Sequence, residues 1–329
     1  INDFAGQVIF NASGKISASK FGICGSTNSN LGAGSIIGFN CGVAGGPKLI
    51  YTGTGETTDR ILRFNSHGQV EQAGTGLLTF SGTPQMIGGN VIVTLLGSTA
   101  GEGEISGVIA NGAGAAVTKS GTGKWTLSGS NLYANATTLS QGTLALSGTN
   151  GSILSSSGIS IAAGSTLLLG NTPTANHPNR IKDNGMVTMA GGALRFQHTA
   201  GATSYSENVG TVALGSGPNI IAASQAATGQ TSAVTIASLT RTSGTVDFVG
   251  SGLGVDARNR IFITGQANGL IGPWATVNGS ALAAYDSALG VYAAGDASYT
   301  DISARGPSTI PDSSSANIRI NSDGTSGPI

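Results

Sequence analysis

The chain has 329 residues, of which 54 are glycine and 9% are charged, and its 15 basic residues balance its 15 acidic ones. Ordinary soluble domains carry about 25% charged residues and roughly 7% glycine, so this composition argues against a fold built from amphipathic helices. Zero net charge leaves no electrostatic footprint for nucleic acid or an anionic membrane, and no apolar run approaches the ~20 residues of a spanning helix. We therefore expect an all-β chain without a nucleic-acid partner and without membrane insertion.

The N-terminal segment, residues 1–46, is rich in glycine, serine and asparagine and matches no repeat. We expect it to form the first coils or a cap of the fold. Its two cysteines, Cys24 and Cys41, leave two alternatives open: a disulfide, which is typical of extracellular proteins, or two small buried side chains. Because no Cys/His cluster accompanies them, the segment predicts no zinc site.

Residues 47–305 repeat one phrase, in which a glycine turn precedes a short alternating strand. The copies include AGTGLLTFSG, GTGKWTLSG, QGTLALSG and AAGSTLLLG. Glycine supplies the positive φ of a bend, and the alternation puts every second side chain on one face. The same place in successive copies is held by Trp125, Leu144, Leu167 and Leu194. Their regular spacing is typical of a repeat protein whose stacked units share one core.

We expect these repeats to form a β-solenoid. If a coil takes ~20 to 25 residues and coils stack at ~4.8 Å, the chain forms roughly 13 to 16 coils and a rod about 65 Å long. An antiparallel β-sandwich array is the alternative, since it also has short strands and glycine turns. Its hairpins would lie at the Asn-Gly pairs, which begin at Asn111, Asn150, Asn184, Asn268 and Asn278.

The segment Gly103–Gly148 carries the most regular motif. It runs through a Gly-Thr-Gly turn, a strand ending in Ser-Gly, an Asn-x-Tyr step, a Thr-Thr pair and a Gly-Thr-Leu strand. In this pattern it closely resembles the autotransporter-associated β-strand repeat, and it departs from that family at Asn135 and Ala136, where glycine is usual. We expect structural roles for the motif residues, which are Gly121, Thr122, Gly123, Trp125, Leu127, Ser128, Gly129, Asn131, Tyr133, Thr137, Thr138, Gly142, Thr143 and Leu144.

The resemblance implies an all-β, right-handed parallel β-helix on a bacterial surface, and it leaves local hairpins near the ends open. Proteins with this repeat are usually long secreted passengers, and the repeat implies no catalytic activity. We therefore expect an extracellular structural β-solenoid, acting as a stalk, coat or fibre component with adhesion. Its expected partners are other copies of itself, through end-to-end or lateral assembly, neighbouring segments of a longer parent chain, or surface glycans.

The alternative function is a glycan-binding or polysaccharide-cleaving β-helix. Cleavage needs two carboxylates ~5 to 9.5 Å apart, or carboxylates that hold Ca²⁺ beside a basic side chain. Binding would use aromatic side chains as sugar platforms, and the candidates are Trp125, Tyr133, Trp274 and Tyr285. The acidic groupings are Asp183 with Lys182 and Arg180, and Asp256 with Arg258 and Arg260.

We expect both acidic groupings to be solvated turn residues, so the sequence predicts no enzyme, no catalytic residue, no cofactor and no metal site. The stretch SGLGVDARN, residues 251–259, imitates a Ca²⁺-binding β-roll repeat only once and without its first glycine. His67, His177 and His198 lie in separate segments and predict neither a metal site nor a catalytic triad.

The C-terminal segment, residues 306–329, is rich in proline and serine. Pro307 and Pro311 interrupt strand pairing, whereas ANIRINSDG has the alternation of a strand. Two alternatives stay open for this segment: a connector that adds one strand, or a linker.

Overall fold

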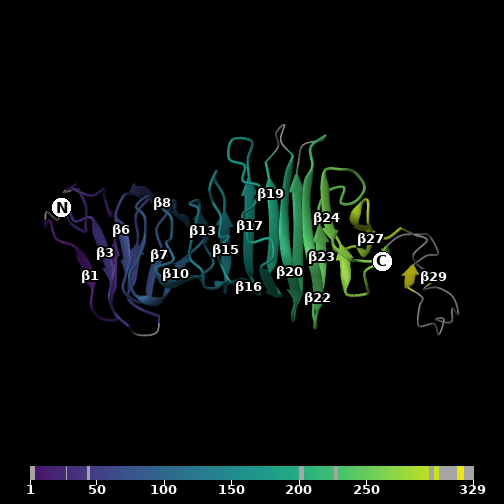
Figure 1. Ribbon diagram of the computed structural model, residues 1–329, viewed down its shortest axis with the longest axis horizontal. Helices are drawn as coiled ribbons and strands as arrows, with labels where there is room; N and C mark the ends of the chain where they lie inside the picture. Colours follow the sequence, from purple (N-terminus) through teal and green to yellow (C-terminus); the bar gives the residue numbers. More distant parts are fainter. Residues whose placement is uncertain are drawn as a thin grey trace.

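The computed structural model describes residues 4–26, 28–42, 45–199, 204–225, 229–295, 300–303 and 317–321. These residues form an elongated stack of β-coils, with the N-terminal strands at one end and the C-terminal strands at the other (Figure 1). The described part of the chain contains no helix, and none of it could therefore cross a membrane as one. The prediction of an all-β solenoid is confirmed.

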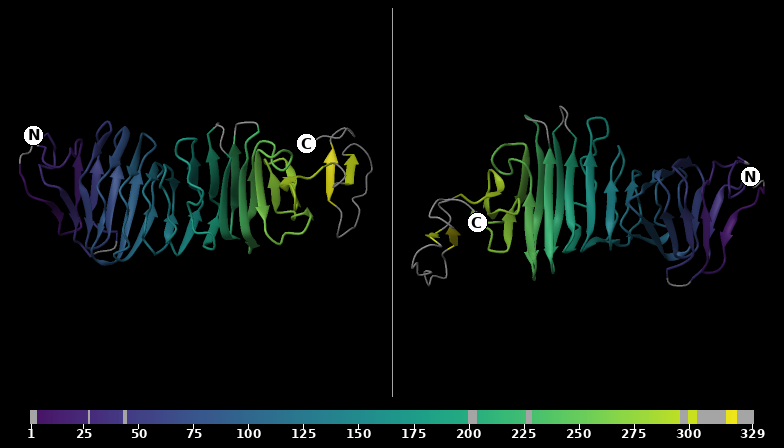
Figure 2. Two further views of the ribbon diagram at one scale, coloured as in Figure 1. Left: turned by 45° about the horizontal axis from the view of Figure 1, so that its top comes forward. Right: turned by 180° about the vertical axis from the view of Figure 1, so that it is seen from behind.

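Successive coils build three sheets, of which the first has four strands in the N-terminal part and the other two run along the stack (Figure 2). The first sheet holds β1 (Val8–Phe10), β3 (Ile36–Phe39), β6 (Ile61–Phe64) and β9 (Gln85–Met86). The second holds β2 (Lys15–Ala18), β4 (Lys48–Tyr51), β7 (Gly68–Gln72), β10 (Gly89–Gly97), β12 (Ala113–Lys119), β14 (Thr137–Leu139), β16 (Gly158–Ala162), β18 (Met186–Ala190), β20 (Tyr205–Leu214), β22 (Ser232–Arg241) and β24 (Asn259–Ile263).

The third sheet starts at one end of the stack and reaches the other. Its coil strands are β5 (Glu56–Thr58), β8 (Gly76–Phe80), β11 (Gly101–Ile105), β13 (Lys124–Leu127), β15 (Gly142–Leu146), β17 (Ser165–Asn171), β19 (Ala193–His198), β21 (Pro218–Gln225), β23 (Thr245–Val249) and β26 (Ala275–Val277). Neighbouring coils pair in parallel, as β13 does with β15 and β12 with β14. The antiparallel sandwich alternative is therefore wrong.

The stack has about ten turns, fewer than the expected 13 to 16 coils. The strand register gives the reason. Thr137 pairs with Val117 across a coil of the expected length, but Lys48 pairs with Lys15 across a much longer one. Many coils thus take more residues than expected, and the strands Ala281–Asp286 and Gly290–Ala293, which follow β26, pair antiparallel instead of forming further coils. At ~4.8 Å per coil, ten turns make a rod about 50 Å long.

One interior ladder runs through the third sheet at the position that the repeats predict. Trp125 pairs with Leu144, Leu144 with Leu167, and Leu167 with Leu194, and all four side chains are buried. On the preceding coil the partner of Trp125 is Gly103. A Cβ atom on Gly103 would overlap the indole ring. The ladder therefore accommodates its largest side chain next to a residue that has none.

A second ladder lies in the first sheet, where β1, β3 and β6 each end in phenylalanine followed by asparagine. The rings of Phe10, Phe39 and Phe64 stack, with centroids 5.3 and 4.5 Å apart. The amides of the three following asparagines are joined by hydrogen bonds of 3.1 and 2.6 Å. The phrases VIFN, IGFN and LRFN are the sequence signal for this ladder, and a search centred on glycine turns misses them.

A loop between β2 and β3, described at residues 19–26 and 28–34, covers the N-terminal edge of the third sheet. The carboxylate of Glu56 in β5 accepts hydrogen bonds from the backbone N–H groups of Phe21 and Gly22, at 2.5 and 3.0 Å. The fully buried guanidinium of Arg60 donates to carbonyls of the same loop, among them that of Phe21 at 2.8 Å. The N-terminal segment thus supplies coil strands, through β1, β2 and β3, and also a covering loop.

Antiparallel strands cover the C-terminal end. β27 (Ala281–Asp286) pairs with β26, β25 (Gly269–Leu270) and β28 (Gly290–Ala293). Between β26 and β27, Asn278 and Gly279 have φ angles of 52° and 65°, the left-handed conformations that a type I′ hairpin requires. A hairpin near this end is thus confirmed.

One further pair of strands lies beyond the antiparallel cover. β29 (Thr300–Ser303) pairs in parallel with β30 (Ile318–Asn321) in a two-stranded sheet. β30 lies within ANIRINSDG, where the connector alternative predicts a strand. Apart from residues 317–321, the segment 306–329 falls outside the described part of the chain.

Candidate functional site

The aromatic side chains proposed as sugar platforms are mostly inaccessible. Trp125 and Tyr133 are fully buried, and Tyr285 is 5% exposed. Trp274 is half-buried, and the guanidinium carbon of Arg241 lies 5.2 Å from the centre of its ring. A sugar ring could therefore not stack on the first three, and on the fourth it would compete with a cation already in place.

Asn131 of the repeat motif ties three coils together. Its Oδ1 atom accepts a hydrogen bond from the N–H of Ile109 at 3.0 Å, on the preceding coil. Its Nδ2 atom donates to the carbonyl of Gly129 at 2.7 Å, and to that of Ser152 on the next coil at 3.2 Å. Because the side chain is buried, these bonds satisfy its polar atoms inside the fold.

The Tyr and Thr of the motif form a second buried network. The hydroxyls of Tyr133 and Thr137 lie 2.8 Å apart, and that of Thr137 lies 2.9 Å from the hydroxyl of Ser156 on the next coil. Burial raises the pKa of Tyr133, so the phenol stays protonated. At Gly123 and Gly142 a Cβ atom would overlap the backbone of the preceding coil. These motif residues therefore sit between coils, and they form no open site.

Lys119 is a fully buried lysine at the end of β12. Its Nζ atom donates to the carbonyls of Ser120 at 2.8 Å, Gly121 at 2.7 Å and Gln141 at 3.1 Å. Burial lowers its pKa to about 8. All three donors of the ammonium are used by the turn and by the next coil, so Lys119 has the geometry of an anchor for the Gly121 turn.

The members of the two acidic groupings differ in exposure. Asp183 and Lys182 are exposed, whereas Arg180 is fully buried. Asp256 makes an ion pair of 3.0 Å with Arg258 on an exposed turn, and the backbone N–H of Arg258 also lowers the pKa of that carboxyl. In the described ranges, no three His, Cys, Asp or Glu side chains are grouped so that they could hold a metal ion.

Arg180 is the centre of a buried polar cluster that the sequence did not reveal. Its Nε atom donates to Oδ1 of Asn171 at 2.9 Å, and its terminal nitrogens donate to the carbonyls of Gly151 and Gly148 at 2.6 and 2.8 Å. Burial lowers its pKa to about 10, and the charge of Glu207 raises it. The guanidinium thereby fixes the long connection between β17 and β18 against the preceding coil.

Glu207 in β20 holds the same connection from the other side. Its carboxylate accepts the backbone N–H of Arg180 at 2.9 Å and that of Ile181 at 3.2 Å. Burial raises the pKa of Glu207 to about 8, although the two backbone bonds act in the opposite direction. Glu207 follows the inward alternation Tyr205, Glu207, Val209, and this alternation is the one signal that could have identified it.

His198 completes the cluster. Its ring stacks on that of Tyr205, with centroids 4.3 Å apart. Burial, and to a smaller extent the charge of Arg180, lowers the pKa of His198 to about 4. Its Nδ1 atom and the hydroxyl of Tyr205 are buried without a hydrogen-bond partner, which costs free energy. Because the polar side-chain atoms of Arg180 and Glu207 bond to the fold itself, the cluster anchors a connection.

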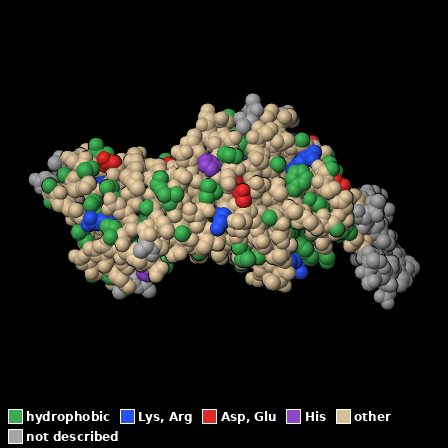
Figure 3. Space-filling model, viewed as in Figure 1, with side chains coloured by type: hydrophobic (Ala, Val, Ile, Leu, Met, Phe, Trp, Pro, Cys, Tyr) green, Lys and Arg blue, Asp and Glu red, His purple; other side chains and the backbone are tan. Residues whose placement is uncertain are grey.

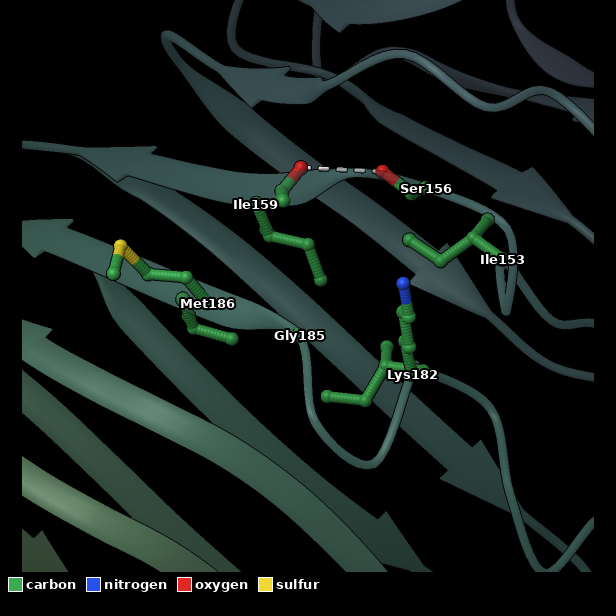
Figure 4. A pocket seen from close by; sticks show the side chains of 9 residues that line it. Ile153, Ser156, Ile159, Lys182, Gly185 and Met186 are labelled. Atoms are coloured by element: carbon green, nitrogen blue, oxygen red, sulfur yellow. Dashed lines mark hydrogen bonds between the residues drawn. The ribbon is translucent and has the colours of Figure 1, made fainter.

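A small pocket opens between two successive coils close to this connection (Figure 4). Ile153, Ser156 and Ile159 line it on one coil, and Lys182 and Met186 line it on the next. Its empty volume is about 220 Å³. In Figure 4 the Lys182 side chain extends across the opening towards Ile153.

Both cysteines are free thiols in the structure. Cys24 is exposed in the covering loop, and Cys41 is buried after β3. The disulfide alternative is therefore not realised, and the alternative of two buried side chains holds for Cys41 alone. The backbone N–H of Cys24 donates to Oδ1 of Asp59 at 2.6 Å, so the loop is held there without a covalent bond.

The passenger-associated transport repeat matches residues 117–146 of the chain. This stretch contains the Lys119 anchor, the buried Trp125 and the Tyr133 network. The adhesin BmaC autotransporter of Brucella suis biovar 1 (strain 1330) is 31% identical to the chain over 140 residues, which make up 40% of the chain and 4% of the adhesin. No solved structure matches the chain. The resemblance to autotransporter passengers is thus confirmed, in a chain that matches a small fraction of the adhesin's length.

Proposed function

We propose that this chain, a β-solenoid with one passenger-associated transport repeat, is a non-enzymatic segment of a bacterial surface adhesin and lies outside the cell. The repeat at residues 117–146 and the likeness to an autotransporter adhesin support this proposal. In this role the inward side chains join the coils, and the outward side chains meet the target.

The burial of the chemically distinctive side chains carries the proposal. The groups with the largest pKa shifts, Lys119, Tyr133, Arg180, His198 and Glu207, are all buried. The visible face is mostly neutral, with few and separated charged side chains (Figure 3). A neutral rod with a continuous core is better suited to present a binding surface than to form a catalytic site.

Adhesion is tested with beads that carry the purified chain. We expect these beads to adhere to cultured epithelial cells several-fold more than beads coated with albumin, and the soluble chain to compete with them. Beads coated with heat-unfolded chain are the matched control. Binding equal to that of albumin beads would contradict the adhesive role.

Two further measurements test the rest of the proposal. Antibodies against the chain should label intact cells that produce the parent protein, and brief protease treatment of those cells should remove the label. Incubation with acidic polysaccharides should yield neither new reducing ends nor unsaturated sugars. Release of either product would show an enzyme.

We propose neighbouring segments of a longer parent chain as its assembly partners. β1 and β2 each pair with one strand among the described residues, β3 and β4, and the opposite edges are open. An open parallel edge can template a further strand. Self-assembly through the ends is the alternative, and sedimentation velocity separates the two, because a monomer at micromolar concentration argues against filaments.

A further inference from the structure

The outward side of the second sheet carries no charge over the even-numbered strands from β10 to β22. Among the residues of these strands, Lys119 and Glu207 are buried, and the guanidinium of Arg241 lies over the ring of Trp274. The third sheet differs, because it bears charged side chains that are not buried, namely Glu102, Glu104, Lys124, Arg195 and Asp247. We call the outward side of β10 to β22 the neutral face.

A column of hydroxyl groups runs along the neutral face. The strand register places the following residues next to one another on five successive strands: Thr94, Thr118, Thr138, Ser160 and Thr188. Their neighbours along the strands, such as Val117 and Leu139, are buried, so the five side chains point outward. Among the described residues, no protein group forms a hydrogen bond with any of the five hydroxyls. Because a hydroxyl both donates and accepts, such a column can pair with an identical column.

Small and apolar side chains flank the hydroxyl column. Ala116 and Gly158 lie on one side of it and Ala190 on the other. Ile92, which is 38% exposed, pairs with Ala116, and Met186, which is 54% exposed, pairs with Gly158. The neutral face thus offers apolar contact beside its hydroxyl groups, and each large side chain has a small neighbour.

The area of the neutral face matches that of a standard protein–protein interface. With strands ~4.8 Å apart, a mean strand length of about seven residues and a rise of ~3.3 Å per residue, the strands cover roughly 800 Å². A stable interface buries about 800 Å² on each partner. A second copy of the chain can therefore cover the whole face.

Two-fold symmetry brings the neutral face onto itself. β16 is the middle strand of the face, so rotation about an axis parallel to β16 reverses the strand order and superimposes the whole face. Ser160 then lies opposite Ser160 of the second copy, and Thr138 lies opposite Thr188. Met186 lies opposite Ala136, so a large side chain meets a small one. This is an isologous contact, in which both copies use the same surface.

We propose that two copies of this chain pair through the neutral face and form a two-fold dimer, in which the solenoids lie side by side in opposite directions. The hydroxyl columns bond to each other, and the absence of charge on the face removes repulsion between identical surfaces. This inference goes beyond the adhesive function and does not rest on it, since it concerns one face of the second sheet and leaves the outward side of the third sheet free.

Sedimentation equilibrium of the purified chain tests the proposal. We expect a monomer–dimer equilibrium without larger species. Ser160→Asp places two carboxylates opposite each other at the two-fold axis, so it should raise the dissociation constant roughly tenfold or more. Thr138→Asp should also weaken the dimer. The double variant Thr138→Asp with Thr188→Lys should restore it, because each carboxylate then faces an ammonium group of the second copy.

Thr166→Asp is the matched control, because Thr166 is a half-buried residue of β17 in the third sheet. It should leave the dissociation constant unchanged, and circular dichroism should show that all variants are folded. A chain that stays monomeric up to its solubility limit, equal losses in Ser160→Asp and Thr166→Asp, or no recovery in the double variant overturns the proposal. Association that persists unchanged in Ser160→Asp also overturns it, because the ends of the solenoid would then form the contact.

Discussion

Two coils of the solenoid bury charge in different ways. The repeat coil, residues 117–146, buries one lysine, whose three donors all reach nearby carbonyls. The long coil, which runs from β16 to β18, buries Arg180 together with His198 of β19 and Glu207 of β20, with a raised pKa for the acid and lowered pKa values for the two bases. In the strand register, Gly158 of β16 pairs with Met186 of β18, so this coil takes more residues than the repeat coil, in which Val117 pairs with Thr137. The shorter coil thus buries a single charged side chain, whereas the longer coil has room to bury a cluster of three titratable side chains.

Truncation of the Trp125 ring, the largest in the repeat coil, should lower the free energy of unfolding more than any other change proposed here. Trp125→Ala removes a fully buried indole and leaves a cavity in the ladder, so we expect a loss of about 3 to 5 kcal/mol in the free energy of unfolding. Urea denaturation followed by circular dichroism measures it. Trp274→Ala is the control, because its half-buried ring should cost clearly less. Equal losses would show that the ladder does not carry the stability of the repeat coil.

Addition of one methyl group at Gly103, the partner of Trp125 on the preceding coil, should cause the second largest loss in the free energy of unfolding. Gly103→Ala places a Cβ atom where the Trp125 indole lies, so we expect a loss of about 1 to 3 kcal/mol. In the double variant Gly103→Ala with Trp125→Leu, the smaller side chain leaves room for the methyl group. The loss in the double variant should therefore be smaller than the sum of the two single losses, and strict additivity in urea unfolding would contradict the contact.

The long coil should make stability depend on pH, with the smallest of the three effects. The pKa of Glu207 is raised to about 8 from 4.5, so the folded state holds this proton more tightly and stability falls as pH rises between those values. The pKa of His198 is lowered to about 4 from 6.5, so its contribution falls as pH drops from 6.5 to 4. The two oppose each other below pH 6.5, and above it Glu207 dominates until the pH nears 8, where Lys119, whose pKa is lowered to about 8, starts to lose its proton in the folded state and acts in the opposite direction.

We therefore expect stability to fall between pH 6.5 and 8 by on the order of 1 to 2 kcal/mol. Glu207→Gln should remove this slope, because the amide oxygen can still accept the N–H groups of Arg180 and Ile181. Urea midpoints across this range provide the measurement. A slope that persists in Glu207→Gln would assign the pH dependence to another group.

The regular coils could be predicted because their physics is local. Glycine turns and alternating strands mark each coil, and the shared place of Trp125, Leu144, Leu167 and Leu194 indicated the strand register in advance. The hairpin at Asn278 was also readable, because Asn-Gly favours the left-handed turn that it forms.

The remaining features depend on contacts between distant segments. Arg180 meets carbonyls 29 and 32 residues away, and no local pattern reports such a partner. The covering loop of residues 19–34 is held by Glu56 and Arg60, which lie on a later coil. Sequence periodicity also underestimated coil length, because insertions between strands leave the strand motif unchanged.

The fit of Trp125 against Gly103 has a consequence for how such proteins diversify. A gene segment that encodes one coil could be duplicated or exchanged freely only if every coil had the same inner profile. Here a coil with a large ring needs a neighbour with a vacancy, and Gly68 likewise leaves room for the rings of Phe39 and Phe64, which precede it in the chain. Recombination between coils should therefore succeed mainly when neighbours move together, so the heritable unit is a matched pair of coils.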